Sequence, residues 1–179
     1  MSCKCFVNIR KFPQGSSFSE RLDLSKCLCT ARFVVKENKC RFELLSCTMD
    51  EVDKYKIDNY FNQDKTQKKC DYYFNYHSSD KPNVCIFVEL KGIDIETAVQ
   101  QLEATLADFE KNDYFCDIKN TKVLCAIVST GSPSNDSTYR SLIKNLKSKH
   151  KQLNPTVERK KYDMRYNPKT GECFGKGEK

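Results

Sequence analysis

Long apolar runs are missing from this chain of 179 residues. The longest apolar stretches, such as 84–88 and 123–128, are the size of strands and fall far below the ~20 residues that a membrane-spanning helix needs. The first ten residues also lack the apolar centre of a secretory signal. We therefore expect a cytoplasmic protein without a membrane partner.

Histidine is scarce, and no module for reading DNA bases is recognisable in the chain. The two histidines, His77 and His150, belong to no arrangement that would activate a nucleophile. Without a helix-turn-helix or a zinc finger, sequence-specific recognition of DNA would depend on loops alone.

Cysteine, in contrast, is abundant, but its placement argues against a disulfide framework. The eleven cysteines are odd in number, and Cys70, Cys85 and Cys125 lie inside apolar runs, where cysteine behaves as a small hydrophobic residue. In the cytoplasm these thiols would be reduced. Two C-x-C pairs could together offer four thiolates to a structural zinc, although this spacing is unusual for one. They are formed by Cys3, Cys5, Cys27 and Cys29.

Composition and length indicate one domain over residues 1–179. With 39% hydrophobic residues the chain can form a real core, but it is too short for two comfortable domains. We place the core at about 31–152 and expect a basic C-terminal tail or hairpin over 153–179.

Alternation and turn residues predict a mixed α/β fold. The runs 31–36 and 40–46 read as a hairpin, and 71–76 and 84–90 read as a second one. Apolar spacing predicts a helix beginning near Asp94, followed by a strand over 122–129.

The second hairpin places three charged residues together. Side chains alternate along a strand, so Glu89 and Lys91 share one face while Val88 and Leu90 point to a core on the other. Pairing of the two strands would bring Asp71 beside Glu89. Two neighbouring carboxylates repel unless a cation holds them, and Mg²⁺ is bound by such a pair with water and substrate phosphates.

This pattern resembles the PD-(D/E)xK nuclease superfamily, with Asp71, Glu89 and Lys91 as the matching residues. Many members follow the E-x-K strand with a helix that contains a glutamine, and Gln101 is the better match because it lies on the shoulder of the apolar stripe. The resemblance covers roughly 67–130 and departs from the motif at Cys70, where the name-giving proline would stand. It implies a restriction-endonuclease-like core, a central mixed β-sheet flanked by helices.

The same resemblance implies a chemistry. Asp71, Glu89 and the backbone carbonyl of Leu90 would hold Mg²⁺ or Mn²⁺ for phosphodiester hydrolysis. Lys91 would orient or deprotonate the attacking water, and Gln101 would position that water or a phosphate oxygen. The superfamily often adds an upstream glutamate to the metal site, and the spacing does not choose among Glu20, Glu37 and Glu43.

The net charge of +7 is concentrated near the C-terminus. The segment from Arg140 to Lys161 contains eight lysines and arginines but only one acidic residue, a glutamate. Within a helix expected over 137–152, four of these cations form one face, which we call the basic ridge and interpret as a track for nucleic-acid phosphates. The ridge consists of Arg140, Lys144, Lys147 and Lys151.

We therefore expect a metal-dependent endonuclease acting on nucleic acid in restriction, repair or defence. DNA is favoured over RNA by the resemblance alone, and many such nucleases are homodimers. Two alternatives stay open: a non-catalytic nucleic-acid-binding module on the same fold, and a protein-interaction domain whose basic ridge contacts an acidic partner.

Overall fold

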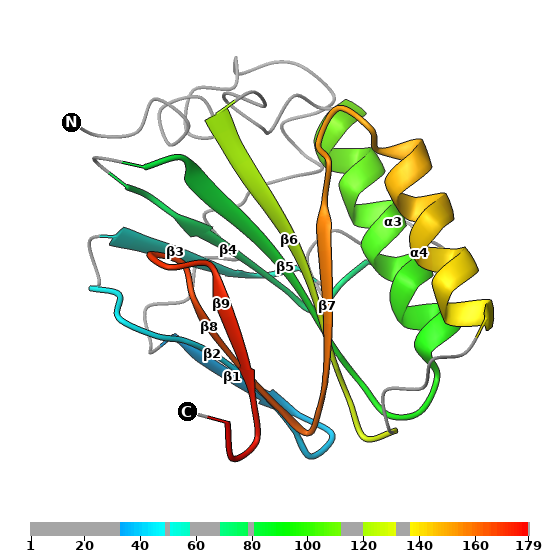
Figure 1. Ribbon diagram of the computed structural model, residues 1–179, viewed down its shortest axis with the longest axis horizontal. Coiled ribbons are helices and arrows are strands. Elements are labelled where there is room, and N and C mark those ends of the chain that lie inside the picture. Colours follow the sequence, from blue (N-terminus) through cyan, green and yellow to red (C-terminus); the bar gives the residue numbers. More distant parts are fainter. Residues whose placement is uncertain are drawn as a thin grey trace, which may run out of the picture.

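The computed structural model describes residues 33–48, 51–57, 69–78, 81–111, 120–131 and 137–178. They form a mixed α/β fold of three layers: helices, a five-stranded sheet, and a four-stranded sheet (Figure 1). No helix in these ranges is long and apolar enough to cross a membrane. The expected zinc cysteines, together with Glu20, lie outside the described residues.

The five-stranded sheet is mixed. Its first three strands pair antiparallel, and the last three pair parallel. In spatial order it contains β3 (Val52–Lys56), β4 (Tyr72–Tyr76), β5 (Asn83–Lys91), β6 (Thr121–Ser129) and β7 (Thr156–Lys161). The expected pairing of 71–76 with 84–90 is confirmed, because Tyr72 lies opposite Val88 and Tyr76 opposite Val84.

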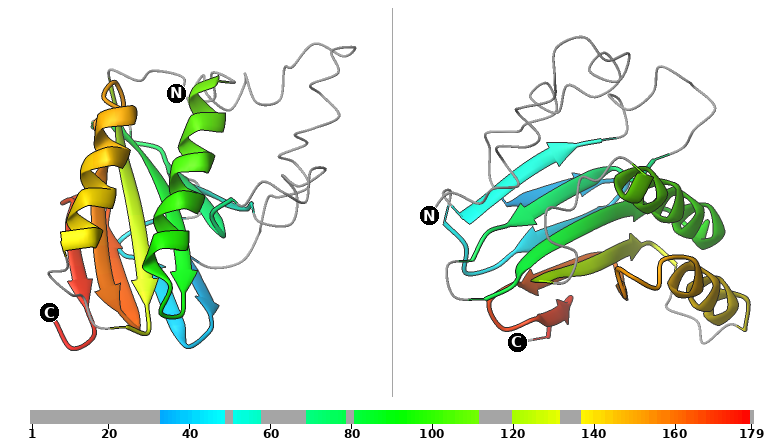
Figure 2. Two further views of the ribbon diagram at one scale, coloured as in Figure 1. Left: turned by 90° about the vertical axis from the view of Figure 1, so that its right-hand side faces the viewer. Right: turned by 90° about the horizontal axis from the view of Figure 1, so that it is seen from above.

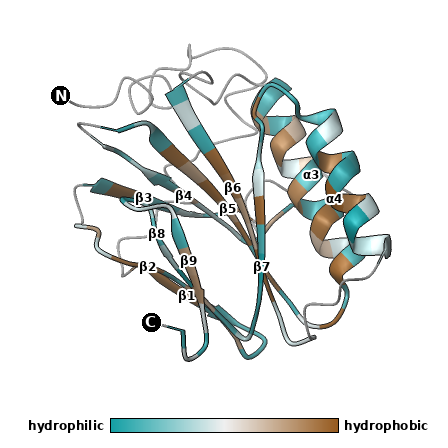
Figure 3. Cartoon of the chain, viewed as in Figure 1, coloured by the Kyte–Doolittle hydropathy of each residue, from teal (hydrophilic) through white to brown (hydrophobic). Residues whose placement is uncertain are grey.

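Strands β5 and β6 lie at the centre of this sheet and are buried on both faces, as expected for near-continuous apolar runs in a parallel pair. Figure 3 shows hydrophobic residues along both strands and on the sides of the helices that face them. The core expected on the face of Val88 and Leu90 lies under the four-stranded sheet, and the face of Glu89 and Lys91 is covered as well, by the helices.

Helix α3 (Ile95–Lys111) connects β5 to β6 and packs on the five-stranded sheet. Asp94 caps it, since its Oδ1 accepts a hydrogen bond from the backbone N–H of Thr97 at 3.0 Å. The ring of Phe109, which is fully buried, meets the rings of Tyr73 and Phe87 edge-on at 5.0 and 4.9 Å between centroids. These aromatic contacts hold the helix against β4 and β5.

Helix α4 (Ser137–Lys149) lies beside α3 (Figure 2). Lys149 forms an ion pair with Glu103 of α3 at 2.5 Å, and Nδ1 of His150 lies 2.5 Å from Oε2 of Glu110. Leu146 is the buried residue of α4 and joins the same core as Phe109. The helix expected over 137–152 is thus present, and it ends three residues earlier.

The four-stranded sheet joins the beginning of the described chain to its end. It contains β1 (Val34–Glu37), β2 (Cys40–Leu44), β8 (Asp163–Asn167) and β9 (Glu172–Gly175). The β1–β2 hairpin turns at Asn38 and Lys39, both of which have positive φ, and β2 pairs parallel with β8. The segment from 153 onward, expected as a tail or hairpin, therefore supplies strands to both sheets.

Candidate active site

The expected site residues meet where β5 ends and β4 begins. Asp71 immediately precedes β4, while Glu89 and Lys91 lie at the end of β5. Cys85 and Phe87 of β5 belong to the core beneath the helices, so by alternation Glu89 and Lys91 also face α3. The sequence-based prediction that Asp71 would lie beside Glu89 agrees with the strand register, in which Tyr72 is opposite Val88.

Asp71 is held by main-chain hydrogen bonds from both neighbouring strands. Its Oδ2 accepts from the backbone N–H of Leu90 at 2.7 Å, and its carbonyl accepts from the backbone N–H of Ile57 at 2.9 Å. With 6% of its surface exposed, Asp71 is locked beside the end of β5. Its carboxylate is therefore positioned before any ligand binds.

Glu89 is the more deeply buried of the two carboxylates, with 1% of its surface exposed. The ammonium nitrogen of Lys91 lies 3.5 Å from Glu89 Oε1. Burial raises the pKa of the Cys70 thiol well above its usual value, and the charges of Glu89 and Asp71 raise it further. The negative charges of both carboxylates therefore lie close to Cys70 and close to each other.

Gln101 is buried in α3, whereas its neighbour Gln100 is exposed, as the apolar stripe predicted. Both ends of its amide are used. Oε1 accepts from Lys91 Nζ at 2.7 Å, and Nε2 donates to the carbonyl of Lys69 at 2.8 Å. Gln101 thus orients Lys91, and we describe it as a positioning residue; its expected contact with the attacking water or a phosphate oxygen stays a prediction.

Three further residues support this arrangement and were missed from the sequence. Thr105, one turn after Gln101, accepts a hydrogen bond from the backbone N–H of Cys70 at 2.9 Å. Lys69 is 1% exposed, pairs with Asp108 and donates to the carbonyl of Ala104 at 3.1 Å. The sequence places Thr105 and Asp108 on the same side of the helix as Gln101, which was the available signal for this cluster. Their partners, residues 69 and 70, are more than thirty positions away in the chain, so the sequence did not identify the contacts.

Cys40 of β2 is the third missed residue. Its thiol donates to the carbonyl of Lys91 at 3.3 Å, so the four-stranded sheet touches the end of β5 at this point. Burial raises the pKa of the Cys40 thiol, and the charge of Asp71 adds to the rise. Cys40 is therefore a neutral donor that helps to fix the backbone of Lys91.

The donor set fits a hard divalent cation. Asp71 and Glu89 contribute two negative charges against the single ammonium of Lys91, since the charge of Lys69 is offset by Asp108. Mg²⁺ is commonly held by one or two carboxylates with water and substrate oxygens. No cluster of three or more His, Cys, Asp or Glu occurs in the described ranges, and a site of this type does not require one.

The carbonyl of Leu90 is also suitably directed. Within a strand the N–H and C=O of one residue point to the same neighbour, and the N–H of Leu90 points to Asp71. The side chain of Leu90 is buried on the opposite face, in the core shared with the four-stranded sheet. Only its main chain can therefore take part in the site.

The basic ridge lies on the other side of α3. Residues Gln101, Thr105 and Asp108 of α3 face the segment 69–70, while Glu103 and Glu110 face α4. All four ridge side chains are exposed. Helical spacing places Arg140, Lys144 and Lys147 away from Lys149, which contacts α3, and Lys151 lies in the turn after α4. The ridge therefore does not line the carboxylates directly.

The two described upstream glutamates are not drawn into the site by any contact in the described ranges. Glu37 is exposed at the end of β1. Glu43 is half-buried and forms an ion pair with Arg41 at 2.6 Å, which agrees with the surface role of a strand residue.

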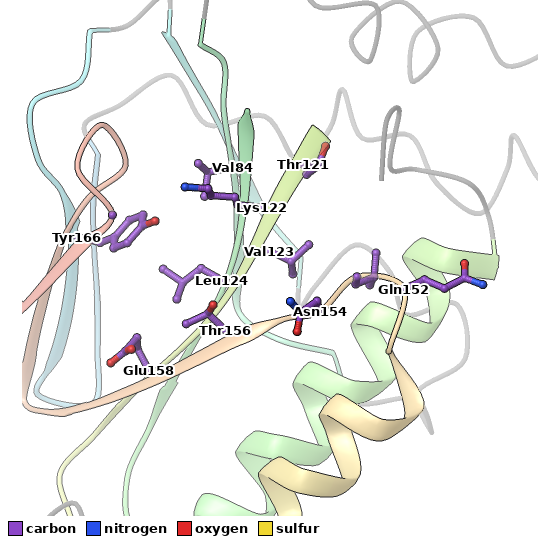
Figure 4. Close-up of a pocket in the computed structure, with 12 residues that line it drawn as sticks. Val84, Thr121, Lys122, Val123, Leu124, Gln152, Asn154, Thr156, Glu158 and Tyr166 are labelled. Carbon is purple, nitrogen blue, oxygen red and sulfur yellow. The ribbon is translucent and has the colours of Figure 1, made fainter. Parts of the chain in front are cut away.

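A pocket of about 470 Å³ opens at the opposite ends of the strands (Figure 4). It is bordered by residues near the starts of β5, β6 and β7, by the turn at 152–154 and by Tyr166 of β8. The members drawn in Figure 4 include Val84, Lys122, Leu124, Asn154, Thr156 and Glu158. None of the residues expected to act in chemistry lines this pocket, so it lies apart from the candidate site.

No protein-family model matches this chain, and no curated protein or solved structure shows a significant match to it. The geometry of the site is therefore the basis for assigning a function.

Proposed function

We propose that the chain is a metal-dependent nuclease that hydrolyses phosphodiester bonds, with Asp71, Glu89 and Lys91 as its central residues. The observation that supports this most is the hydrogen bond from the N–H of Leu90 to Asp71 Oδ2 at 2.7 Å. It fixes the first carboxylate beside the E-x-K strand end, although β4 and a loop separate the two segments in the chain.

The order of elements supports the same proposal. An acid precedes one strand, E-x-K ends the antiparallel neighbour, and the following helix returns the chain to a parallel strand while presenting a buried glutamine. We therefore assign the five-stranded sheet with α3 to a restriction-endonuclease-like core. The helices described here cover one face of that sheet, and the four-stranded sheet covers the other.

In the proposed mechanism Asp71, Glu89 and the carbonyl of Leu90 would hold Mg²⁺ or Mn²⁺, which would offset the charge that develops on the scissile phosphate. Lys91 would orient the attacking water as an ammonium, or accept its proton as a neutral amine, and its side chain is 28% exposed and can reach a ligand. Gln101 keeps the Lys91 ammonium near the carboxylates through the 2.7 Å hydrogen bond.

The test combines Mn²⁺ titration calorimetry with cleavage of plasmid DNA and of a mixed-sequence RNA. Asp71→Asn and Glu89→Gln keep the size of each side chain, and the amide oxygen that Asp71→Asn introduces can still accept from the N–H of Leu90. We expect both variants to lose metal binding and cleavage together while keeping the wild-type circular dichroism spectrum.

Glu103→Gln is the matched control, because Glu103 faces α4 and pairs with Lys149 outside the site. It should cleave like the wild type. Full cleavage by both site variants would refute the assignment. Salt-sensitive binding of nucleic acid without cleavage by the wild type would favour the non-catalytic binding module, and DNA binding no tighter than to any polyanion would favour the protein-interaction domain.

A further inference from the structure

Three strand ends meet in one row beside the proposed site. Lys91 of β5 lies opposite Ser129 of β6, which lies opposite Lys161 of β7. Arg159 precedes Lys161 by two residues and so shares its face of the sheet. Its guanidinium donates to Ser129 Oγ at 3.4 Å. We call Lys91, Ser129, Arg159 and Lys161 the strand-end row.

The row continues toward α4. The guanidinium of Arg159 lies over the ring of Tyr139 at 5.3 Å from the centroid, and Tyr139 is in the first turn of α4 next to Arg140. The basic ridge therefore begins where the strand-end row ends. Cations thus extend from Lys91, beside the carboxylates, across the ends of β6 and β7 to the exposed face of α4.

Exposed apolar side chains occur at the same edge. In the described part of the chain, the large hydrophobic residues left exposed are Ile93, at 81%, and Tyr162, at 39%. Ile93 follows Lys91 by two residues, and Tyr162 follows Lys161 directly. A Cβ atom placed on Gly131 would lie 3.7 Å from Nη2 of Arg159 and 4.0 Å from Cα of Ile93, so the loop after β6 brings these residues close together.

Tyr162 has an unusual backbone for its residue type. Its φ is 62°, in the left-handed region that favours glycine and asparagine. Its N–H donates to the carbonyl of Ser129 at 2.9 Å and its carbonyl accepts from the N–H of Arg41 at 2.8 Å, which fixes the corner where the chain passes between the sheets. These two hydrogen bonds explain why the backbone turns here. Glycine would adopt this φ more easily, so the turn does not explain why a tyrosine stands at this position.

We propose that this edge binds an unpaired nucleic-acid strand, with Arg159 and Lys161 contacting its phosphates and Tyr162 stacking on one of its bases. Aromatic rings with adjacent cations are the usual platform for single strands, because every base has a stacking face. The Lys161 ammonium already lies 5.1 Å from the centroid of the Tyr162 ring, so charge and ring are presented together. Taken together with the proposed nuclease activity, on which this step depends, the single-strand site implies that the substrate is a nucleic acid with a single-stranded segment.

The proposal is tested by measuring nucleic-acid binding under conditions that prevent metal-dependent cleavage. Fluorescence anisotropy in EDTA compares a labelled 15-nucleotide single-stranded DNA, its RNA counterpart and the matching duplex with the full chain. We expect the single strands to bind at least tenfold more tightly than the duplex. Tyr162→Leu should weaken single-strand binding by about 5-fold to 100-fold, while Tyr162→Phe should keep it within about 2-fold, because stacking needs the ring and not the hydroxyl.

The double variant Arg159→Ala/Lys161→Ala should reduce the slope of log K against log salt by about 1.4, since each lost phosphate contact on a single strand accounts for about 0.7. Lys111→Ala/Lys122→Ala removes the same charge from exposed positions at the opposite ends of the strands and should leave the slope unchanged. Tyr162→Gly is the folding control and should melt no lower than the wild type.

The outcomes separate the two proposals. Equal affinity for duplex and single strand, or equal loss in the opposite-end control, would overturn the binding inference even if the protein cleaves plasmid DNA. Tight single-strand binding that depends on Tyr162, with no cleavage in Mn²⁺, would retain the inference and refute the nuclease. Absence of all nucleic-acid binding would overturn the inference.

Discussion

Replacing Gln101 by leucine would test whether the buried amide positions Lys91. Leucine keeps most of the apolar volume but removes two hydrogen bonds, the 2.7 Å bond from the Lys91 ammonium and the 2.8 Å bond to the Lys69 carbonyl. A bond to a charged group contributes about 1.5–3 kcal/mol and a neutral one about 0.5–1.5 kcal/mol. Water can replace part of the first, because the Lys91 side chain is 28% exposed. We therefore expect the free energy of unfolding to fall by about 2–3 kcal/mol.

The effect on catalysis should be larger than this loss suggests. Without Gln101, the Lys91 ammonium would lose the 2.7 Å hydrogen bond that holds it in its present position, 3.5 Å from Glu89 Oε1. Because a misplacement of about 1 Å can reduce a rate by about 100-fold, we expect kcat to fall about 10- to 100-fold. The affinity for Mn²⁺ should stay within about threefold, since neither Gln101 nor Lys91 is a proposed ligand.

The assay measures single-turnover cleavage, Mn²⁺ affinity by calorimetry and urea unfolding for the same preparations. Gln100→Leu is the matched control, because Gln100 is exposed and its amide contacts Glu96 at 3.3 Å, away from Lys91. It should change none of the three quantities. Wild-type cleavage by Gln101→Leu despite the expected loss of stability would refute the positioning role, and a joint loss of metal affinity would show instead that Gln101 shapes the metal site.

Two further predictions concern the supports of the site and the core. Thr105→Val leaves the buried N–H of Cys70 without its 2.9 Å acceptor, so it should destabilise the fold by about 1–3 kcal/mol and weaken Mn²⁺ binding, whereas Thr105→Ser, which keeps the hydroxyl, should preserve metal affinity in the same titration. Burial raises the pKa of Cys125 from 9.0 to about 12, so the native state keeps a proton that the unfolded chain loses; stability should fall above pH 9 by up to about 1.4 kcal/mol per pH unit from this thiol. Urea unfolding from pH 8 to 10.5 under reducing conditions should show a flatter decline in Cys125→Ala than in the wild type, and parallel slopes would refute the assignment.

Much of the local structure was predictable because it depends on neighbours in the chain. The apolar run at 84–90 identified β5, and the alternation of side chains along a strand placed Glu89 and Lys91 on one face. The apolar period after Asp94 distinguished the buried Gln101 from the exposed Gln100. The β4–β5 pairing followed from two apolar runs separated by a polar loop, which limited the register to few choices.

The role of Gln101 was not predictable in the same way. Its position on the helix follows from periodicity, but its hydrogen-bond partners, Lys91 and the carbonyl of Lys69, depend on how α3 docks over the start of β4. The docking in turn depends on the packing of Phe109 between Tyr73 and Phe87, three residues from separate elements.

The sequence by itself determined the elements and the chemical groups on their faces, because hydrophobic period and turn residues act over a few positions. Only the tertiary structure decided that the strand ends of β5, β6 and β7 align Lys91, Ser129 and Lys161 in one row. Only it showed that a second sheet covers the face of β5 opposite the helices and brings Cys40 to the backbone of Lys91. These contacts join residues 32 to 51 positions apart, and long-range register and packing, which no local pattern encodes, set them.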